Sequence, residues 1–147
     1  MNPLNILCVD DFPQLLELRR ATLEPQGYCV KVASNGSIAM KILKEDPVDA
    51  VLLEYKLEGM DAEAIACHIK QQFPNLPIIL LSAYTDMPRR TLSLVDEYVM
   101  KSEMPEGLNR AVQRVMHRVK VDEWHRSPSV RNTLRFGRLH SSSSVQQ

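Results

Sequence analysis

The stretch ILCVDD (residues 6–11) is a run of apolar residues that stops at two adjacent carboxylates. An unbroken apolar run of this length is typical of a strand buried on both faces, as in parallel sheets covered by helices. Residues 50–53 and 78–81 form two further runs of this kind. The sequence therefore predicts three central strands, and the first of them delivers Asp10 and Asp11 to its carboxyl end.

Segments with helical spacing alternate with the strands. Pro13 suits the first turn of a helix over residues 13–26, and Gly27 suits its end. Asn35 and Asp61 are expected to cap the second and third helices. The second helix is expected to bury Ile38 together with residues 39, 42 and 43. A short helix over residues 88–95 and a long one with an apolar stripe over residues 108–119 complete the pattern.

Two further strands, residues 28–33 and 97–100, are predicted to lie at the edges of the sheet, because they carry Lys31 and Glu97 among their apolar residues. Edges at strands two and five predict the order 2-1-3-4-5. The expected fold class is therefore α/β, with a doubly wound, five-stranded parallel sheet of the flavodoxin-like type. In this order ligands bind at the carboxyl ends of the strands, near the switch point between strands one and three.

Composition excludes several classes of protein. The 147 residues are 44% apolar and carry 18 basic and 18 acidic side chains, which argues against a disordered chain and against a generally basic nucleic-acid binder. No apolar run reaches the roughly 20 residues of a membrane helix, and residues 1–5 do not resemble a secretory signal. Cys8, Cys29 and Cys67 form no metal or redox motif and are expected to be small buried side chains in a reducing cytosol. We therefore expect a cytoplasmic protein.

Polar side chains follow four of the predicted strands. They are Asp10 and Asp11 after the first strand, Glu54 at the end of the third, Ser82 at the end of the fourth and Lys101 after the fifth. Three neighbouring carboxylates raise one another's pKa unless a cation compensates them. Oxygen ligands of this kind suit Mg²⁺, which binds one or two carboxylates together with water and phosphate.

Residues 4–120 resemble the receiver domain of two-component response regulators. The resemblance is carried by residues 6–11 (ILCVDD), 27–28 (GY), 33–36 (ASNG), 49–53 (DAVLL), 59–61 (GMD), 81–83 (LSA) and 98–101 (YVMK). The resemblance implies that Asp10 and Asp11 bind Mg²⁺. It also implies that Ser82 and Lys101 contact a phosphoryl group, and that Tyr98 is an aromatic switch that turns inward on activation.

Glu54 departs from the family, which has its phosphoacceptor aspartate at this position. The extra methylene displaces the carboxylate, so ordinary phosphoryl acceptance is expected to be poor or absent. Three alternatives stay open: Glu54 mimics the phosphorylated state, it only pairs with Lys101 in a retired site, or it is still phosphorylated. Glu58 and Ser102 stand where the family usually has proline, and the bond before Ser102 is expected to be trans.

The predicted organisation is a receiver over residues 1–120 and a partly helical or flexible tail over residues 121–147. The resemblance implies a partner-binding face that includes Arg89, Arg90 and Tyr98. In the tail, a short helix is predicted after Pro128 and up to Gly137, which offers a surface for a partner or a second copy, as in a homodimer.

The functional prediction is a stand-alone, atypical receiver that acts as a protein-interaction module in bacterial-type phosphorelay signalling. It is expected to be no enzyme, to lack a DNA-binding domain and a membrane segment, and to bind a histidine kinase or a downstream signalling protein. The first alternative is a functional Mg²⁺-dependent receiver that a histidine kinase phosphorylates. The second is a small phosphohydrolase or flavin protein, although the five glycines form no phosphate-binding loop.

Overall fold

The computed structural model describes residues 3–126. Its strands are β1 (Asn5–Val9), β2 (Cys29–Ala33), β3 (Ala50–Glu54), β4 (Ile78–Ser82) and β5 (Glu97–Met100). Its α-helices are α1 (Pro13–Leu23), α2 (Gly36–Glu45), α3 (Ala62–Gln72), α4 (Arg89–Ser93) and α5 (Glu106–Arg126). Short 3₁₀ turns, η1 (Glu24–Gln26) and η2 (Lys101–Glu103), follow α1 and β5. The helix predicted between residues 128 and 137 lies outside the described residues.

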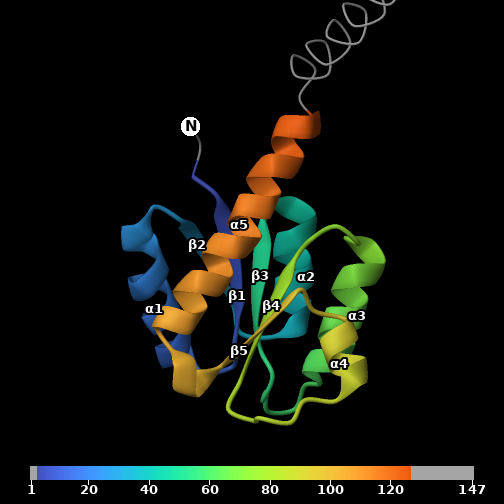
Figure 1. Cartoon of the computed structure of the whole chain (residues 1–147). Helices are drawn as coiled ribbons and strands as arrows, with labels where there is room; N and C mark the ends of the chain where they lie inside the picture. The colour runs from blue at the N-terminus through green and yellow to red at the C-terminus, as the bar shows by residue number, and fades with distance from the viewer. Residues whose placement is uncertain (1–2, 127–147) are drawn as a thin grey trace, which may run out of the picture. The chain divides into compact units, whose positions relative to one another are not determined.

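The sheet is parallel with the order β2-β1-β3-β4-β5, as predicted. Its register aligns Val9 with Ala33 on one side and with Leu53 on the other. Helices α1 and α5 cover one face of the sheet, and α2 and α3 cover the other (Figure 1). Because all five strands run the same way, their carboxyl ends share one edge, where the predicted site residues lie.

Local sequence explains where the helices begin. Pro13 occupies the first turn of α1, where the missing N–H costs nothing. The side chain of Asn35 accepts a hydrogen bond from the N–H of Ile38 at the start of α2. The side chain of Asp61 likewise accepts from the N–H of Glu63 in α3. Both predicted N-caps are therefore confirmed.

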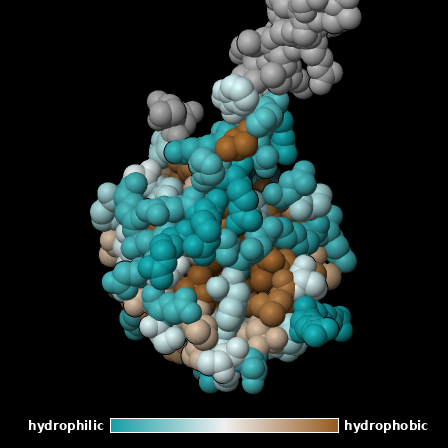
Figure 2. All heavy atoms as spheres, in the orientation of Figure 1, coloured by the Kyte–Doolittle hydropathy of each residue, from teal (hydrophilic) through white to brown (hydrophobic). Residues whose placement is uncertain are grey.

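Two apolar clusters form the core, one on each face of the sheet. All five residues of β3 and of β4 are buried, which explains their unbroken apolar runs. On one face, α5 buries an apolar stripe that includes Leu108, Val112 and Val115. The outward side of this helix is mostly hydrophilic, with a small hydrophobic spot near its upper end and hydrophobic patches beside its lower part (Figure 2).

Three burial predictions were wrong. Ile38 is 41% exposed, because the inward face of α2 is formed by Ala39, Met40 and Leu43. Cys29 is exposed because it is the first residue of an edge strand. Cys67 is only partly buried on α3, so only Cys8 is a fully buried thiol.

The chain divides into a compact unit that ends at Met116 and a second unit that begins at His117, within α5. In the second unit Trp124 is 57% exposed, and its ring meets that of His125 edge-on at 5.2 Å between centroids. The predicted boundary at residue 120 stays a prediction. No helix in residues 3–126 is long and apolar enough to cross a membrane.

Candidate functional site

An ion pair joins two of the predicted site residues at the carboxyl edge of the sheet. The Nζ atom of Lys101, at the start of η2, lies 2.9 Å from Oε2 of Glu54, at the end of β3. The Glu54 side chain is 4% exposed, whereas that of Lys101 is 31% exposed. At the carboxyl ends of the strands, the pair therefore combines a buried anion with a cation that is partly exposed to solvent.

Each oxygen of Glu54 has a different environment. Oε1 accepts a hydrogen bond of 3.3 Å from the N–H of Lys56, two residues further along the chain. Oε2 has no hydrogen-bond donor among the described residues, so its contact with Lys101 is an ion pair without hydrogen-bond alignment. Glu54 is thus fixed at one oxygen by the backbone, and its other oxygen faces the lysine.

The acidic pair after β1 is held by backbone N–H groups. Asp10 Oδ1 accepts from Phe12 at 3.0 Å, and Asp11 Oδ2 accepts from Glu58 at 2.7 Å. Burial raises the pKa of Asp10, the hydrogen bond from Phe12 opposes this rise, and the charge of Glu54 adds to it. The second oxygen of Asp11, Oδ1, is buried without a partner among the described residues.

This donor set suits a hard divalent cation. Asp10 and Asp11 are adjacent carboxylates, and the unpartnered Asp11 Oδ1 is an oxygen that a cation would compensate. In residues 3–126 no three Asp, Glu, His or Cys side chains are grouped closely enough to hold a metal among them. The residues therefore fit Mg²⁺, which keeps several waters and needs only one or two carboxylates.

Ser82 and Tyr98 meet at the backbone of Tyr84, in the loop after β4. Ser82 is 1% exposed, and its Oγ accepts a hydrogen bond of 3.0 Å from the N–H of Tyr84. The hydroxyl of Tyr98 donates to the carbonyl oxygen of Tyr84. The ring of Tyr84 meets that of Tyr55 edge-on at 6.0 Å. The backbone of Tyr84 was not predicted to be part of the site, because the contacts of a backbone group cannot be read from residue types.

Lys101 reaches Glu54 without the proline that the family usually has after the lysine. The bond between Lys101 and Ser102 is trans, as predicted, and among the described residues the cis peptide bond is Met104–Pro105. The three residues from Lys101 form the turn η2 instead.

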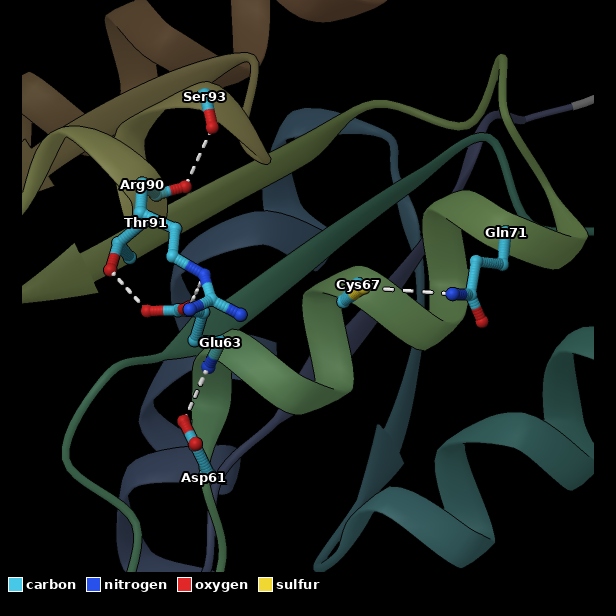
Figure 3. Close-up of polar contacts among 7 residues, drawn as sticks. All are labelled: Asp61, Glu63, Cys67, Gln71, Arg90, Thr91 and Ser93. Atoms are coloured by element: carbon cyan, nitrogen blue, oxygen red, sulfur yellow. Dashed lines mark hydrogen bonds and ion pairs between the residues drawn. The ribbon is translucent and has the colours of Figure 1, made fainter.

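A tether between α3 and α4 was not predicted. Glu63 accepts a hydrogen bond of 2.9 Å from Thr91 Oγ1 and forms an ion pair of 2.7 Å with Arg90 Nε (Figure 3). Thr91 is 1% exposed, whereas the side chain of Arg90 is 86% exposed. The place of Arg90 on a partner surface stays a prediction. No local sequence signal indicates this tether, because Thr91 and its partner Glu63 are 28 residues apart in the chain.

Comparison with known proteins identifies the family. The model of the response regulator receiver domain matches residues 6–113. An NtrX-like response regulator of Rickettsia felis is 37% identical over 86 residues, which are 57% of this chain and 18% of that protein. The DNA-binding response regulator MtrA of Mycolicibacterium smegmatis is 36% identical over 121 residues, which are 80% of this chain and 51% of MtrA. The chain thus spans about half or less of these relatives.

Solved structures agree with the sequence matches. The response regulator TrrA of Thermotoga maritima, crystallised in complex with Mg²⁺ and BeF, has a TM-score of 0.69 and 32% identity. The match covers 76% of this chain and 98% of TrrA. TrrA has also been solved in complex with the histidine kinase ThkA, with a TM-score of 0.70. The chain belongs to the response regulator receiver domain family, the signalling modules of two-component systems.

Proposed function

We propose that this receiver acts by binding a partner protein in phosphorelay signalling, and that the ion pair between Glu54 and Lys101 sets its binding state in place of phosphorylation. The observation that carries the proposal is the 2.9 Å contact between Glu54 Oε2 and Lys101 Nζ. It couples the phosphoacceptor position to the lysine that, by family resemblance, pairs with the phosphoryl group.

The chemistry of phosphoryl transfer supports the loss of phosphorylation. The protein contributes mainly positioning and charge compensation to this reaction. Glutamate moves the acceptor oxygen by about one bond length, and a displacement near 1 Å costs on the order of 10²-fold in rate. In addition, Lys101 already occupies one oxygen of Glu54, and the N–H of Lys56 occupies the other.

Two details bear on whether Glu54 mimics a phosphorylated aspartate or marks a retired site. The hydroxyl of Tyr98 donates to the carbonyl of Tyr84, so the aromatic residue is tied to the loop after β4 without a phosphoryl group. Within the described residues Glu54 contacts Lys101 and the N–H of Lys56 but forms no hydrogen bond with Ser82, whose Oγ accepts from Tyr84. We therefore propose a partial mimic that acts through Lys101 and not through Ser82. A carboxylate is a weaker substitute for a phosphoryl group, because it carries less charge and fewer acceptor oxygens.

The alternative is a Mg²⁺-dependent receiver that a histidine kinase phosphorylates at Glu54. The buried, unpartnered Asp11 Oδ1 favours it, because a cation would satisfy this oxygen. Asp10 and Asp11 would then hold Mg²⁺, which would compensate the charge of an incoming phosphoryl group. The kinase complex of TrrA gives the class of partner.

Incubation with Mg²⁺ and acetyl phosphate, followed by intact-protein mass spectrometry, separates the two functions. We expect no phosphoryl adduct on the wild-type protein, whereas the Glu54→Asp variant gains one phosphoryl group in the presence of Mg²⁺. A stable, Mg²⁺-dependent adduct on the wild type that disappears in Glu54→Gln would establish the alternative. Binding of a cognate histidine kinase to wild type and Glu54→Gln then tests the mimic. We expect weaker binding of the variant, and equal binding would favour the retired site.

A further inference from the structure

A groove of about 750 Å³ lies between α2 and α3, on the face of the sheet opposite α1 and α5. Its volume lies in the range of protein sites that bind ligands or anchor side chains. Its walls are partly apolar: Met60 and Ile65 are partly exposed there, and Met40, which is 7% exposed, lines the groove from the core. This is therefore a surface to which apolar side chains of different shapes can adapt.

The two helices approach closely at one end of the groove. A Cβ atom on Gly36 would lie 3.2 Å from Cγ1 of Ile65, so glycine allows the start of α2 to meet α3. Met60 Sδ accepts a hydrogen bond of 3.4 Å from the N–H of Gly36. The groove is thus anchored by packing that a larger residue at position 36 would disturb.

The rim of the groove carries more positive than negative charge. Lys41 and Lys44 line it from α2, and neither forms an ion pair within residues 3–126. His68 lines it from α3. The acid on the rim, Asp61, already caps α3 through the N–H of Glu63. An occupant with negative charges would therefore find two free cations beside an apolar surface.

We propose that the groove binds an acidic amphipathic segment of a partner protein. Its apolar side chains would lie on Met60 and Ile65, and its carboxylates would pair with Lys41 and Lys44, as in recognition of a helix by a groove. The chain's own residues 127–147 are the wrong occupant by charge, since they contain three arginines and no acid. The proposal rests on the proposed function only in that a receiver acts by binding proteins.

One loop connects the groove to the acidic pocket, which consists of Asp10 and Asp11 after β1 and Glu54 at the end of β3. In the loop between β3 and α3, the N–H of Glu58 donates to Asp11, and Met60 lines the groove two residues later. The N–H of Lys56, at the start of the same loop, donates to Glu54. A segment bound in the groove would therefore contact the loop that holds the carboxylates of the pocket.

Fluorescence anisotropy with two synthetic peptides tests the proposal. The probe is a fluorescein-labelled, 16-residue helical peptide with leucines on one face and glutamates on the other, and the matched peptide has lysine for each glutamate. We expect the glutamate peptide to bind at least ten-fold more tightly to the full chain. The Lys41→Glu/Lys44→Glu double variant should reverse the preference, and the control Lys120→Glu, at an exposed lysine of α5 that does not line the groove, should keep it. Amide chemical shifts of residues 36–44 and 60–68 should change on binding of the glutamate peptide.

Several results would overturn the proposal: equal affinity for both peptides, an unchanged preference in the double variant, or shift changes confined to other elements. Dimerisation that the double variant abolishes would also overturn it, because a second copy would then cover the groove. Circular dichroism melting confirms that each variant is folded, and all substituted lysines are exposed. The proposed function is tested separately, since Glu54→Gln should leave peptide affinity within two-fold whatever the phosphorylation result.

Discussion

The acidic pocket and the groove between α2 and α3 are both charged, but they differ in how those charges are compensated. In the pocket, the carboxylates of Asp10 and Glu54 are each 4% exposed and depend on the domain's own lysine and backbone. On the rim of the groove, Lys41 and Lys44 are exposed and have no ion-pair partner in the described chain. A buried charge needs an ion-pair or hydrogen-bond partner within the fold, whereas an exposed charge is stabilised by water and is free to pair with another molecule. The pocket is therefore suited to set an internal state, and the groove to receive a partner.

The largest expected effect comes from removing the cation of the pocket. Lys101→Met leaves Glu54 buried without its counter-ion, and we expect the free energy of unfolding to fall by about 2–4 kcal/mol. This value is set below that of a fully buried pair because the Lys101 side chain is 31% exposed. Urea denaturation at pH 7 measures it.

Lys44→Met is the matched control on the groove, where the same change should alter stability by less than about 0.5 kcal/mol. Adding Glu54→Gln to Lys101→Met should recover most of the lost stability. If Lys101→Met and Lys44→Met lowered the free energy of unfolding equally, the pocket would depend on its ion pair no more than the rim of the groove does.

The tether between α3 and α4 allows the same comparison of a buried and an exposed partner, because Glu63 contacts the buried Thr91 and the exposed Arg90. Thr91→Val removes the buried donor to Glu63, and we expect a loss of about 1–2 kcal/mol because that carboxylate oxygen keeps no buried partner. Arg90→Gln removes the exposed partner and should cost less than about 0.5 kcal/mol. Thermal denaturation of the two variants measures both losses of stability, and a larger loss for Arg90→Gln than for Thr91→Val would contradict the account.

Asp10 gives the pocket a distinct dependence on pH. Its folded pKa is raised above the ordinary value of 3.8, chiefly by burial, so the folded state binds the proton more tightly than the unfolded chain. This group therefore lowers stability as pH rises from about 4 through the folded pKa.

Asp10→Asn should for that reason raise the free energy of unfolding at pH 7, and the gain should shrink toward pH 3.8 and vanish below it. Urea titrations of both proteins at pH 7 and pH 4 check the sign. A gain that persists unchanged at the lower pH would contradict this origin.

The smallest effect concerns thiol reactivity and leaves stability unchanged. Burial raises the pKa of Cys8 to about 12, so at pH 8 this thiol beneath the pocket should resist a disulfide reagent. Cys29 is exposed and should react first, with the partly buried Cys67 more slowly. Peptide mapping after brief labelling distinguishes them, and early labelling of Cys8 would show that the pocket is open to solvent.

Sequence patterns predicted most of the fold because strand burial and helix capping are local. The unbroken apolar runs identified β3 and β4, and the charged residues Lys31 and Glu97 identified the two edge strands. The parallel order then brought Glu54 and Lys101 to one edge of the sheet, where the structure pairs them. This part of the site depends on topology alone.

What escaped prediction depends on tertiary contacts. The carbonyl of Tyr84 is a backbone group, and the tether from Glu63 to Thr91 joins residues that the sequence separates. The helical spacing alone is compatible with burial of either Ile38 or Met40. Met40 is the buried one because it lies on the side of α2 that packs on the sheet. The groove likewise depends on how α2 packs against α3 at Gly36 and Ile65, a tertiary contact that no residue pattern encodes.

The central claim is that Glu54 and Lys101 set the state of the receiver without a phosphoryl group. The most direct test is the ¹H–¹⁵N spectrum of the full chain titrated with Mg²⁺ and beryllofluoride, the combination present in the TrrA complex. The account predicts that resonances of the loop after β4 and of β5 stay unchanged in the wild type. Saturable chemical-shift changes of Ser82, Tyr84, Tyr98 and Lys101 in the wild type would contradict it, because they would show that the site still responds to a phosphoryl analogue.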